Sequence, residues 1–436
     1  MSLTSSMSRN YVIRNGRIID PSNNRDEVAD IYIAHGEVIG IGAKPEGFQA
    51  EQEIDARNLW VLPGIVDICV RLREPGREHK GTIHTETRAA AKGGITHICC
   101  PPDTSPVIDT PAVASLIQER AHQSGYARVI PLGALTQGLK GTQLSEMQAL
   151  KEAGCIAMTQ LRHPVKDTRT LLRCLEYAAT FDLPVFFQSQ DKGLRAEGVA
   201  HEGFNSARLG LPGIPETAET IGISRDLLLV EQTGIRAHFG QLSCARSVDL
   251  LEQAQARGLQ VTADVAAHQL FFTDEVLDGF NSLYHVDPPF RSENDRRALL
   301  GGVKRGVINV ICSDHQPHEA EAKSAPFADT AAGMSAIETL LPLTYRLVKK
   351  GFLTEAEWVK TLTSAPAAVL GIDAGKINVH TPANLTLFDP NQSWVLNADS
   401  IISEGKNTPL LGESFAGRTR MTFCNGHLTF QDLVNL

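Results

Sequence analysis

Residues 313–318 hold the densest group of side chains that could do chemistry. Asp314, His315 and His318 follow a short apolar run within six residues. Carboxylate and imidazole groups bind transition metals, and an aspartate beside a metal can shuttle protons in hydrolysis. The two histidines could therefore form a metal pair. Because they lack evident partners on other apolar runs, we expect hydrogen-bonding roles or a small anion pocket instead.

A second group lies in the apolar run at 65–72 and just after it. It contains Cys69, Arg71 and Arg73 at alternating positions. A guanidinium stays protonated and has no acceptor, so Arg71 cannot ligate a metal. A lone cysteine in an apolar strand is usually a small buried hydrophobe, and we expect this of Cys69. Since an unpaired buried charge is costly, we expect Asp314 to pair with Arg71, with a general-base role as the alternative.

The elements that must position these groups alternate along the middle of the chain. Apolar strands alternate with helical stretches, which indicates a parallel sheet. Eight such units over about 300 residues predict a (β/α)8 barrel, a fold of typically about 250 residues. An open doubly wound sheet is the alternative, although no G-x-G-x-x-G motif follows the first strand. The strand candidates are 65–72, 95–100, 128–134, 155–160, 183–188, 235–242, 259–265 and 307–313.

Both chain ends have a different pattern. Short segments of alternating apolar and polar residues are joined there by turns such as NG and HG. We predict a β-sandwich domain formed by residues 1–63 and 372–436, beside a barrel domain at 64–371.

The carboxyl ends of barrel strands form the active site in this class of fold. Asp103 follows the second strand there, and the fourth, fifth and sixth strands end near Gln160, Gln188 and Gln241. Neutral amides are weak ligands for divalent transition metals, which prefer His, Cys, Asp or Glu. His79 and His84 lack the H-E-x-x-H spacing of a zinc helix, so we expect them at the surface.

The amino-acid composition limits the kinds of partner and the cellular location that we expect. The chain has 436 residues, a formal net charge of −9 and no long basic run, which argues against a nucleic-acid partner. It has no apolar stretch of 18 residues and no signal-peptide pattern, so we expect a cytoplasmic protein without a membrane segment. The six residues before Met7 are interpreted as start-site residues rather than a targeting signal. Eight scattered cysteines without a C-x-x-C pair indicate reduced thiols.

Motifs along nearly the whole chain resemble the dihydroorotases of the amidohydrolase superfamily. The resemblance implies a metal-binding barrel, with zinc as the family's metal, and a β-sandwich built from both chain ends. The motifs are "LPGIVD" at 62–67, "LREPG" at 72–76, "CPPDTSPVID" at 100–109, "LEYAATFDLPV" at 175–185, "SDHQPH" at 313–318, "PFADTAAGMSAIETLLPL" at 326–343 and "TSAPAAVLGI" at 363–372.

The chain departs from the family's pattern mainly at the metal-binding positions. The family reads D-x-H-x-H-L-R where this chain has Asp67, Cys69, Arg71 and Arg73. The remaining metal positions fall on Gln160, Gln188, Gln241 and Asp314, of which only the aspartate is kept. We therefore expect no bound metal.

The family's site for the substrate carboxylate falls on Arg73, Asp103 and His318. Asp103 stands where the family has asparagine, and its charge would repel the carboxylate of dihydroorotate.

The pattern most resembles the non-catalytic dihydroorotase-like subunits that accompany aspartate carbamoyltransferase in some bacteria. The resemblance implies a structural or regulatory role in pyrimidine biosynthesis, with the carbamoyltransferase catalytic chain as partner and self-association, for instance as a dimer. One alternative is an active metal-dependent cyclic amidase of the dihydroorotase or hydantoinase type. Another is a metal-free protein that binds a small anion through Arg73 and His318.

Overall fold

A computed structural model describes residues 9–432 of the chain. The six residues interpreted as start-site residues lie outside the described range. The twelve α-helices of the described residues are α1 (Ile83–Lys92), α2 (Pro111–Ser124), α3 (Met147–Glu152), α4 (Thr168–Thr180), α5 (Lys192–Arg195), α6 (Phe204–Leu209), α7 (Glu216–Thr233), α8 (Ala245–Ala256), α9 (Glu293–Arg305), α10 (Leu340–Lys349), α11 (Glu355–Leu362) and α12 (Ser364–Leu370).

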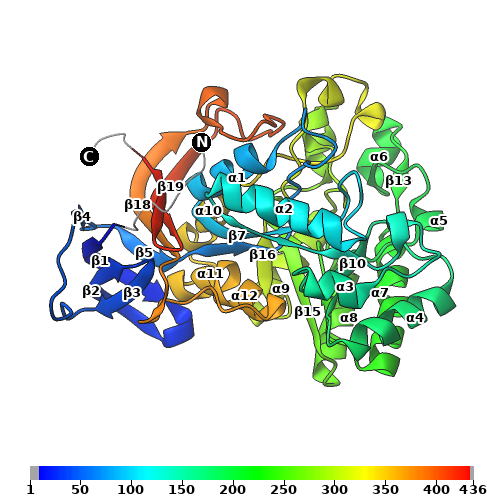
Figure 1. Cartoon of the computed structure of the whole chain (residues 1–436). Coiled ribbons are helices and arrows are strands. Elements are labelled where there is room, and N and C mark those ends of the chain that lie inside the picture. Colours follow the sequence, from blue (N-terminus) through cyan, green and yellow to red (C-terminus); the bar gives the residue numbers. More distant parts are fainter. Residues whose placement is uncertain (1–8, 433–436) are drawn as a thin grey trace.

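The middle of the chain forms a closed parallel barrel, which confirms the predicted fold class (Figure 1). Val70 bridges His315 in parallel, and the Arg71 amide donates to the His315 carbonyl at 3.0 Å, so the first and last strands meet. This closure excludes the open doubly wound sheet. The barrel strands are β6 (Ile65–Asp67), β7 (Ile95–Cys100), β8 (Arg128–Pro131) with β9 (Gly133–Ala134), β10 (Met158–Leu161), β11 (Val185–Phe187), β14 (Ala237–Phe239), β15 (Val261–Ala266) and β16 (Val310–Cys312).

Most barrel strands are shorter than their apolar runs predicted. The backbone leaves the extended conformation two residues past β14 and β16, where φ is +49° at Gln241 and +46° at Asp314. Residues with positive φ cannot continue a β ladder. The apolar runs continue past these points because the residues remain buried, so hydrophobicity overestimated the strand lengths.

The two chain ends share one nine-stranded sheet beside the barrel, and the early and late strands lie together in Figure 1. Strand β5 joins them, because it pairs in parallel with β1 and antiparallel with β18. The sheet curls over its own core, in which the Tyr11 and Phe423 rings lie 5.1 Å apart. Its strands are β1 (Tyr11–Asp20), β2 (Arg25–Ala34), β3 (Glu37–Ile41), β4 (Gln52–Asp55), β5 (Trp60–Pro63), β17 (Thr381–Pro382), β18 (Leu385–Val395), β19 (Ser414–Cys424) and β20 (His427–Gln431).

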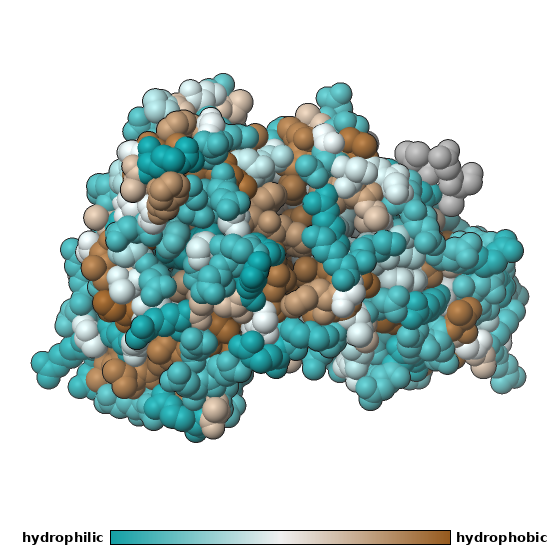
Figure 2. All heavy atoms as spheres, turned by 180° about the vertical axis from the view of Figure 1, so that it is seen from behind, coloured by the Kyte–Doolittle hydropathy of each residue, from teal (hydrophilic) through white to brown (hydrophobic). Residues whose placement is uncertain are grey.

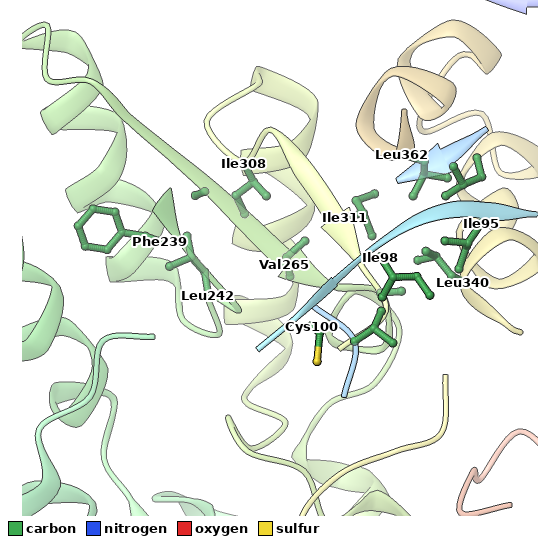
Figure 3. Close-up of a cluster of buried hydrophobic side chains, with 14 of the residues drawn as sticks. Ile95, Ile98, Cys100, Phe239, Leu242, Val265, Ile308, Ile311, Leu340 and Leu362 are labelled. Carbon is green, nitrogen blue, oxygen red and sulfur yellow. The ribbon is translucent and has the colours of Figure 1, made fainter. Parts of the chain in front are cut away.

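The main hydrophobic core lies between the barrel strands and the surrounding helices. Figure 3 shows part of it, including Ile98 on β7, Val265 on β15 and Ile311 on β16. A separate apolar cluster fills the barrel interior, where Cys69 and Cys312 belong to it. These two layers hold the strands in fixed positions and so fix the side chains at their carboxyl ends.

The surface is mainly polar on the face that Figure 2 shows, with apolar residues gathered in patches. His79 and His84 are exposed, which confirms their predicted surface position. Within residues 9–432, no helix combines the length and hydrophobicity needed to cross a bilayer.

Candidate functional site

Arg71 lies at the centre of the barrel's carboxyl end and contacts two carboxylates. Its Nη1 lies 3.2 Å from Asp314 Oδ1, so the predicted ion pair is present. Its Nε donates to Asp103 Oδ2 at 2.7 Å, a second partner that the sequence did not predict. Asp314 is 2% exposed and Arg71 is 9% exposed. The guanidinium therefore compensates one buried and one half-buried carboxylate.

The electrostatics of this group follow from burial and charge pairing. Burial opposes ionisation of Asp103, but Arg71 and Arg73 outweigh it and lower the pKa of this carboxyl. Burial raises the pKa of Asp314, and Arg71 offsets this only in part. For Arg71 itself, burial favours the neutral form, yet the surrounding negative groups raise its pKa. The closer contact, to Asp103, is therefore the firmer ion pair.

Cys69 is a buried thiol, as predicted. Its Sγ lies 3.5 Å from Asp314 Oδ1 and the residue is 4% exposed. Burial raises the pKa of this thiol, and the charge of Asp314 adds to the effect. A thiol held in its neutral form is a weak ligand and a weak nucleophile.

The three predicted glutamines line the same barrel end, and each leaves one amide atom without a hydrogen bond. Gln160 Oε1 accepts from the Thr136 hydroxyl at 3.0 Å. Gln188 Nε2 lies 3.9 Å from Cys69 Sγ, and Gln241 Nε2 lies 3.4 Å from Asp264. The atoms left without a partner are Gln160 Nε2, Gln188 Oε1 and Gln241 Oε1.

Asp264 is a buried carboxylate that the sequence reasoning missed. It follows the inward alternation of β15 and accepts from the backbone N–H of Gln241 at 2.7 Å and from Cys312 Sγ at 3.3 Å. His238 Nε2 lies 2.9 Å from its Oδ2, so this imidazole nitrogen donates to the carboxylate. An aspartate inside the apolar run "VTADVA" was the signal that could have revealed it.

His315 has the predicted hydrogen-bonding role. Its Nε2 donates to Glu86 Oε2 at 2.8 Å, and its Nδ1 accepts from the Ala336 amide at 3.0 Å. Burial opposes ionisation of Glu86, but the hydrogen bonds that its carboxylate accepts from His315, Ser403 and the Glu404 amide outweigh it and lower the pKa of this carboxyl. Both ring nitrogens are used, so His315 ties helix α1 to the end of β16 and has no electron pair left for a metal.

Arg73 and His318 lie in contact with each other. Arg73 Nε donates to the Pro317 carbonyl at 3.0 Å, and its Nη2 lies 3.0 Å from His318 Nε2. Lys80 Nζ lies 3.1 Å from His318 Nδ1. Burial and the cations of Arg73 and Lys80 lower the pKa of His318 to about 2, so its imidazole is neutral. Asp103 turns to Arg71 rather than to this pair.

The chain's own carboxylates meet the other cations of the barrel mouth. Asp287 lies 3.5 Å from Arg195 and 3.8 Å from Arg162, and Glu319 lies 2.9 Å from Lys80. A hollow beside Gln160 and Gln188 offers about 20 Å3, roughly enough for one water molecule.

The donor set does not fit zinc. A zinc site needs several His, Cys, Asp or Glu donors that converge on one point. Residues 9–432 contain no group of three or more such side chains with that arrangement. At the six family positions the chain offers an arginine, three amides, a neutral thiol and one carboxylate already paired with the arginine.

A closed (β/α)8 barrel with a sheet built from both chain ends defines an amidohydrolase-type protein. Among solved structures, the L-hydantoinase of Arthrobacter aurescens matches with a TM-score of 0.85 and 24% identity, covering 97% of this chain and 96% of that one. This likeness establishes the fold.

The chain belongs to the dihydroorotase-like family. The family's sequence model, described as dihydro-orotase-like, matches residues 59–247. The chain is 53% identical over 419 residues to a "Dihydroorotase-like protein" of Pseudomonas aeruginosa, covering 96% of this chain and 99% of that one. It is 40% identical over 420 residues to a "Dihydroorotase" of Syntrophotalea carbinolica, covering 96% and 99% respectively.

Proposed function

We propose that this chain is a non-catalytic dihydroorotase-like protein in which Arg71 replaces the positive charge of the family's metal. The observation that carries the proposal is the position of its guanidinium, between Asp103 and Asp314 at hydrogen-bonding distance. A cation bound at Asp314 would compete with this guanidinium for the same oxygen. The barrel then keeps its shape without a metal, because its buried carboxylates are compensated from within.

Loss of the metal donors removes the means of activating water. Unassisted water has a pKa of about 15.7, which a bound metal can lower to about 7. Asp314 cannot compensate for this difference, because it is held by Arg71 and Gln316, whose Nε2 lies 3.1 Å from Oδ2. This argues against the alternative of an active cyclic amidase. Against the small-anion alternative, the Arg73 guanidinium is already bound by the Pro317 carbonyl and His318, and Lys80 beside His318 pairs with Glu319.

The function we propose is support of a partner, namely the catalytic chain of aspartate carbamoyltransferase. Two observations support this proposal. The chain matches its relatives over nearly their whole length, yet most of the metal-binding residues of the family are replaced in it. The identity of the partner comes from the family resemblance. The proposal includes a cytoplasmic location, self-association of the chain, and a total interface of roughly 1,200 Å2 or more, as in stable complexes.

Co-expression with the carbamoyltransferase from the same organism tests the partner. We expect co-elution in size-exclusion chromatography with light scattering at micromolar concentration, and a transferase that is less stable alone. Separate elution, with a transferase equally active and stable by itself, would overturn the proposal. Elemental analysis of the purified chain and an assay of dihydroorotate hydrolysis with added zinc test the catalytic part separately.

A further inference from the structure

A cavity of about 240 Å3 lies at the amino-terminal ends of strands β11, β14 and β15, opposite to the Arg71 centre. Helix α12 forms its other wall. Barrel enzymes of this class use the carboxyl ends of the strands, so this cavity is separate from the degenerate site. The cavity is larger than the roughly 150 Å3 cavity that accommodates benzene in an engineered protein core.

The inner wall is a row of three side chains in strand register. Phe186 pairs with His238, and His238 pairs with Thr262, so their side chains point to the same face. The Phe186 and His238 rings lie 4.8 Å apart, and Phe186 is 7% exposed. The two ring planes are tilted by 44°, so Phe186 and His238 form an angled aromatic floor of the cavity, while Leu259 and Val369 complete an apolar wall.

The polar atoms of the inner row are fixed by neighbours. His238 Nε2 donates to Asp264, so Nδ1 accepts from the Thr262 hydroxyl at 2.8 Å. The wall therefore offers no charged group of its own at depth. A flat, apolar ring is the part of a ligand that suits this depth.

The rim carries the charge. Arg236 is exposed, and its Nη2 donates to the carbonyl and the carboxylate of Asp182, both at 3.1 Å. The side chain of Asp182 is 84% exposed, which makes this ion pair a weak one. An anionic group on a ligand can therefore share the Arg236 guanidinium at the mouth of the cavity.

We propose that this cavity binds a small single-ring aromatic carboxylate, with the ring against Phe186 and His238 and the carboxylate at Arg236. The inner row determines where the ring of the ligand lies, and Arg236 at the rim determines which way its carboxylate points. The inference is independent of the proposed partner, since it uses the opposite end of the barrel.

Benzoate and its neutral analogue benzamide are suitable probes for the full-length protein. We expect saturable benzoate binding at one site in calorimetry and saturation-transfer NMR. Val369→Trp fills the cavity and should weaken binding of both probes by about tenfold or more. A tenfold change corresponds to about 1.4 kcal/mol of binding free energy. Val395→Trp, at an exposed valine on β18, is the matched control and should leave binding unchanged. Ala368→Phe serves as a second filling variant if Val369→Trp does not fold.

Arg236→Gln tests the charge separately. We expect about threefold weaker benzoate binding and unchanged benzamide binding, as for an exposed ion pair. Arg173→Gln, at an exposed arginine on α4 that pairs with Glu176, is the control. Absence of saturable binding, or binding that survives both cavity-filling variants, would overturn the site. Equal losses for benzoate and benzamide in Arg236→Gln would overturn the assignment of a carboxylate.

Discussion

At the scale of single residues, Arg71 decides the character of the barrel centre. Replacing it leaves the buried Asp314 without its ion-pair partner and the half-buried Asp103 with only the weaker influence of Arg73, so we expect Arg71→Met to lower the free energy of unfolding by about 3–5 kcal/mol. Urea denaturation followed by circular dichroism measures this. Arg57→Met is the control, because Arg57 pairs with Asp55 at the surface, where little change is expected. An Arg71→Met protein as stable as the parent would show that the carboxylates need no compensation.

Restoring two of the family's imidazoles is not expected to restore a metal site. The double variant Cys69→His, Arg71→His supplies two ligands beside Asp314, yet Gln160, Gln188 and Gln241 still stand at the other positions. Removal of the guanidinium also takes from Asp103 its ion-pair partner. We expect no zinc-dependent turnover of dihydroorotate, measured by absorbance, and a less stable protein. Turnover that depends on added zinc would refute the argument that the amides prevent catalysis.

His268 predicts how stability depends on pH. Both of its ring nitrogens lack a hydrogen bond, and burial lowers its pKa to about 4. The unfolded chain binds this proton near pH 6.5, so stability is complete above that pH and is lost as the pH falls toward 4. His268→Phe removes this proton uptake, and the ring can keep its edge contact with Phe290. We therefore compare the unfolding free energy of the variant with that of the parent at two pH values. This difference should be about 2 kcal/mol more favourable to the variant at pH 5 than at pH 7.5.

Thermal unfolding of the parent and the variant at both pH values checks this expectation. Burial also lowers the pKa of His97 and His285 to about 4, so the parent as a whole should lose stability in the same window. If the difference between the two proteins is the same at pH 5 and pH 7.5, His268 does not titrate with unfolding.

At the scale of elements, the contact between the β7 end of the barrel and the sheet depends on one glycine. Gly94 has a φ of +85°, and a Cβ there would meet Thr386 Cγ2 of β18 at 2.6 Å. Its carbonyl also accepts from the Thr386 hydroxyl. Gly94→Ala therefore combines backbone strain of about 1–2 kcal/mol with overpacking of about 1–3 kcal/mol.

Gly125→Ala is the matched control for this variant. Gly125 also has a positive φ, +72°, but nothing lies within 4 Å of its added Cβ. We expect Gly125→Ala to lose only the strain, and Gly94→Ala to lose clearly more in the same denaturation experiment. Equal losses would mean that the sheet moves away from the barrel without cost.

At the scale of the whole molecule, the barrel and the sheet should unfold together. Trp60 and Phe388 of the sheet pack with Tyr345 and Trp358 of the barrel helices, with ring centroids 5.1–6.3 Å apart. Strand β5 also carries the chain directly from the sheet into the barrel. Because this junction is buried, neither part can lose its structure without exposing the other.

We expect one transition in calorimetry, with tryptophan fluorescence and far-ultraviolet circular dichroism changing at the same temperature. Fluorescence reports mainly on the junction, since Trp60 and Trp358 lie in it, whereas circular dichroism reports on all helices. Two resolved transitions, or different midpoints for the two signals, would show that the sheet and the barrel are separate units.

The sequence by itself determined the fold class and most of the candidate site. Hydrophobic periodicity is a local property, and it was enough to predict eight strand–helix units and two β-rich ends. The rule that parallel strands of a barrel end on one face then placed Cys69, Gln160, Gln188, Gln241 and Asp314 together. The pairing of Arg71 with Asp314 also followed, because a buried charge needs a partner.

Only the tertiary structure decided how these side chains share their contacts. Residues 71 and 314 are 243 positions apart, and the bridge between Val70 and His315 that closes the barrel sets their separation. Asp103 reaches Arg71 because it follows β7, the strand that pairs with β6. Past β14 and β16 the extended backbone stops at residues with positive φ, although the apolar run continues. These contacts cannot be predicted from a local sequence pattern. They form between residues far apart in the sequence, which meet only when the barrel closes.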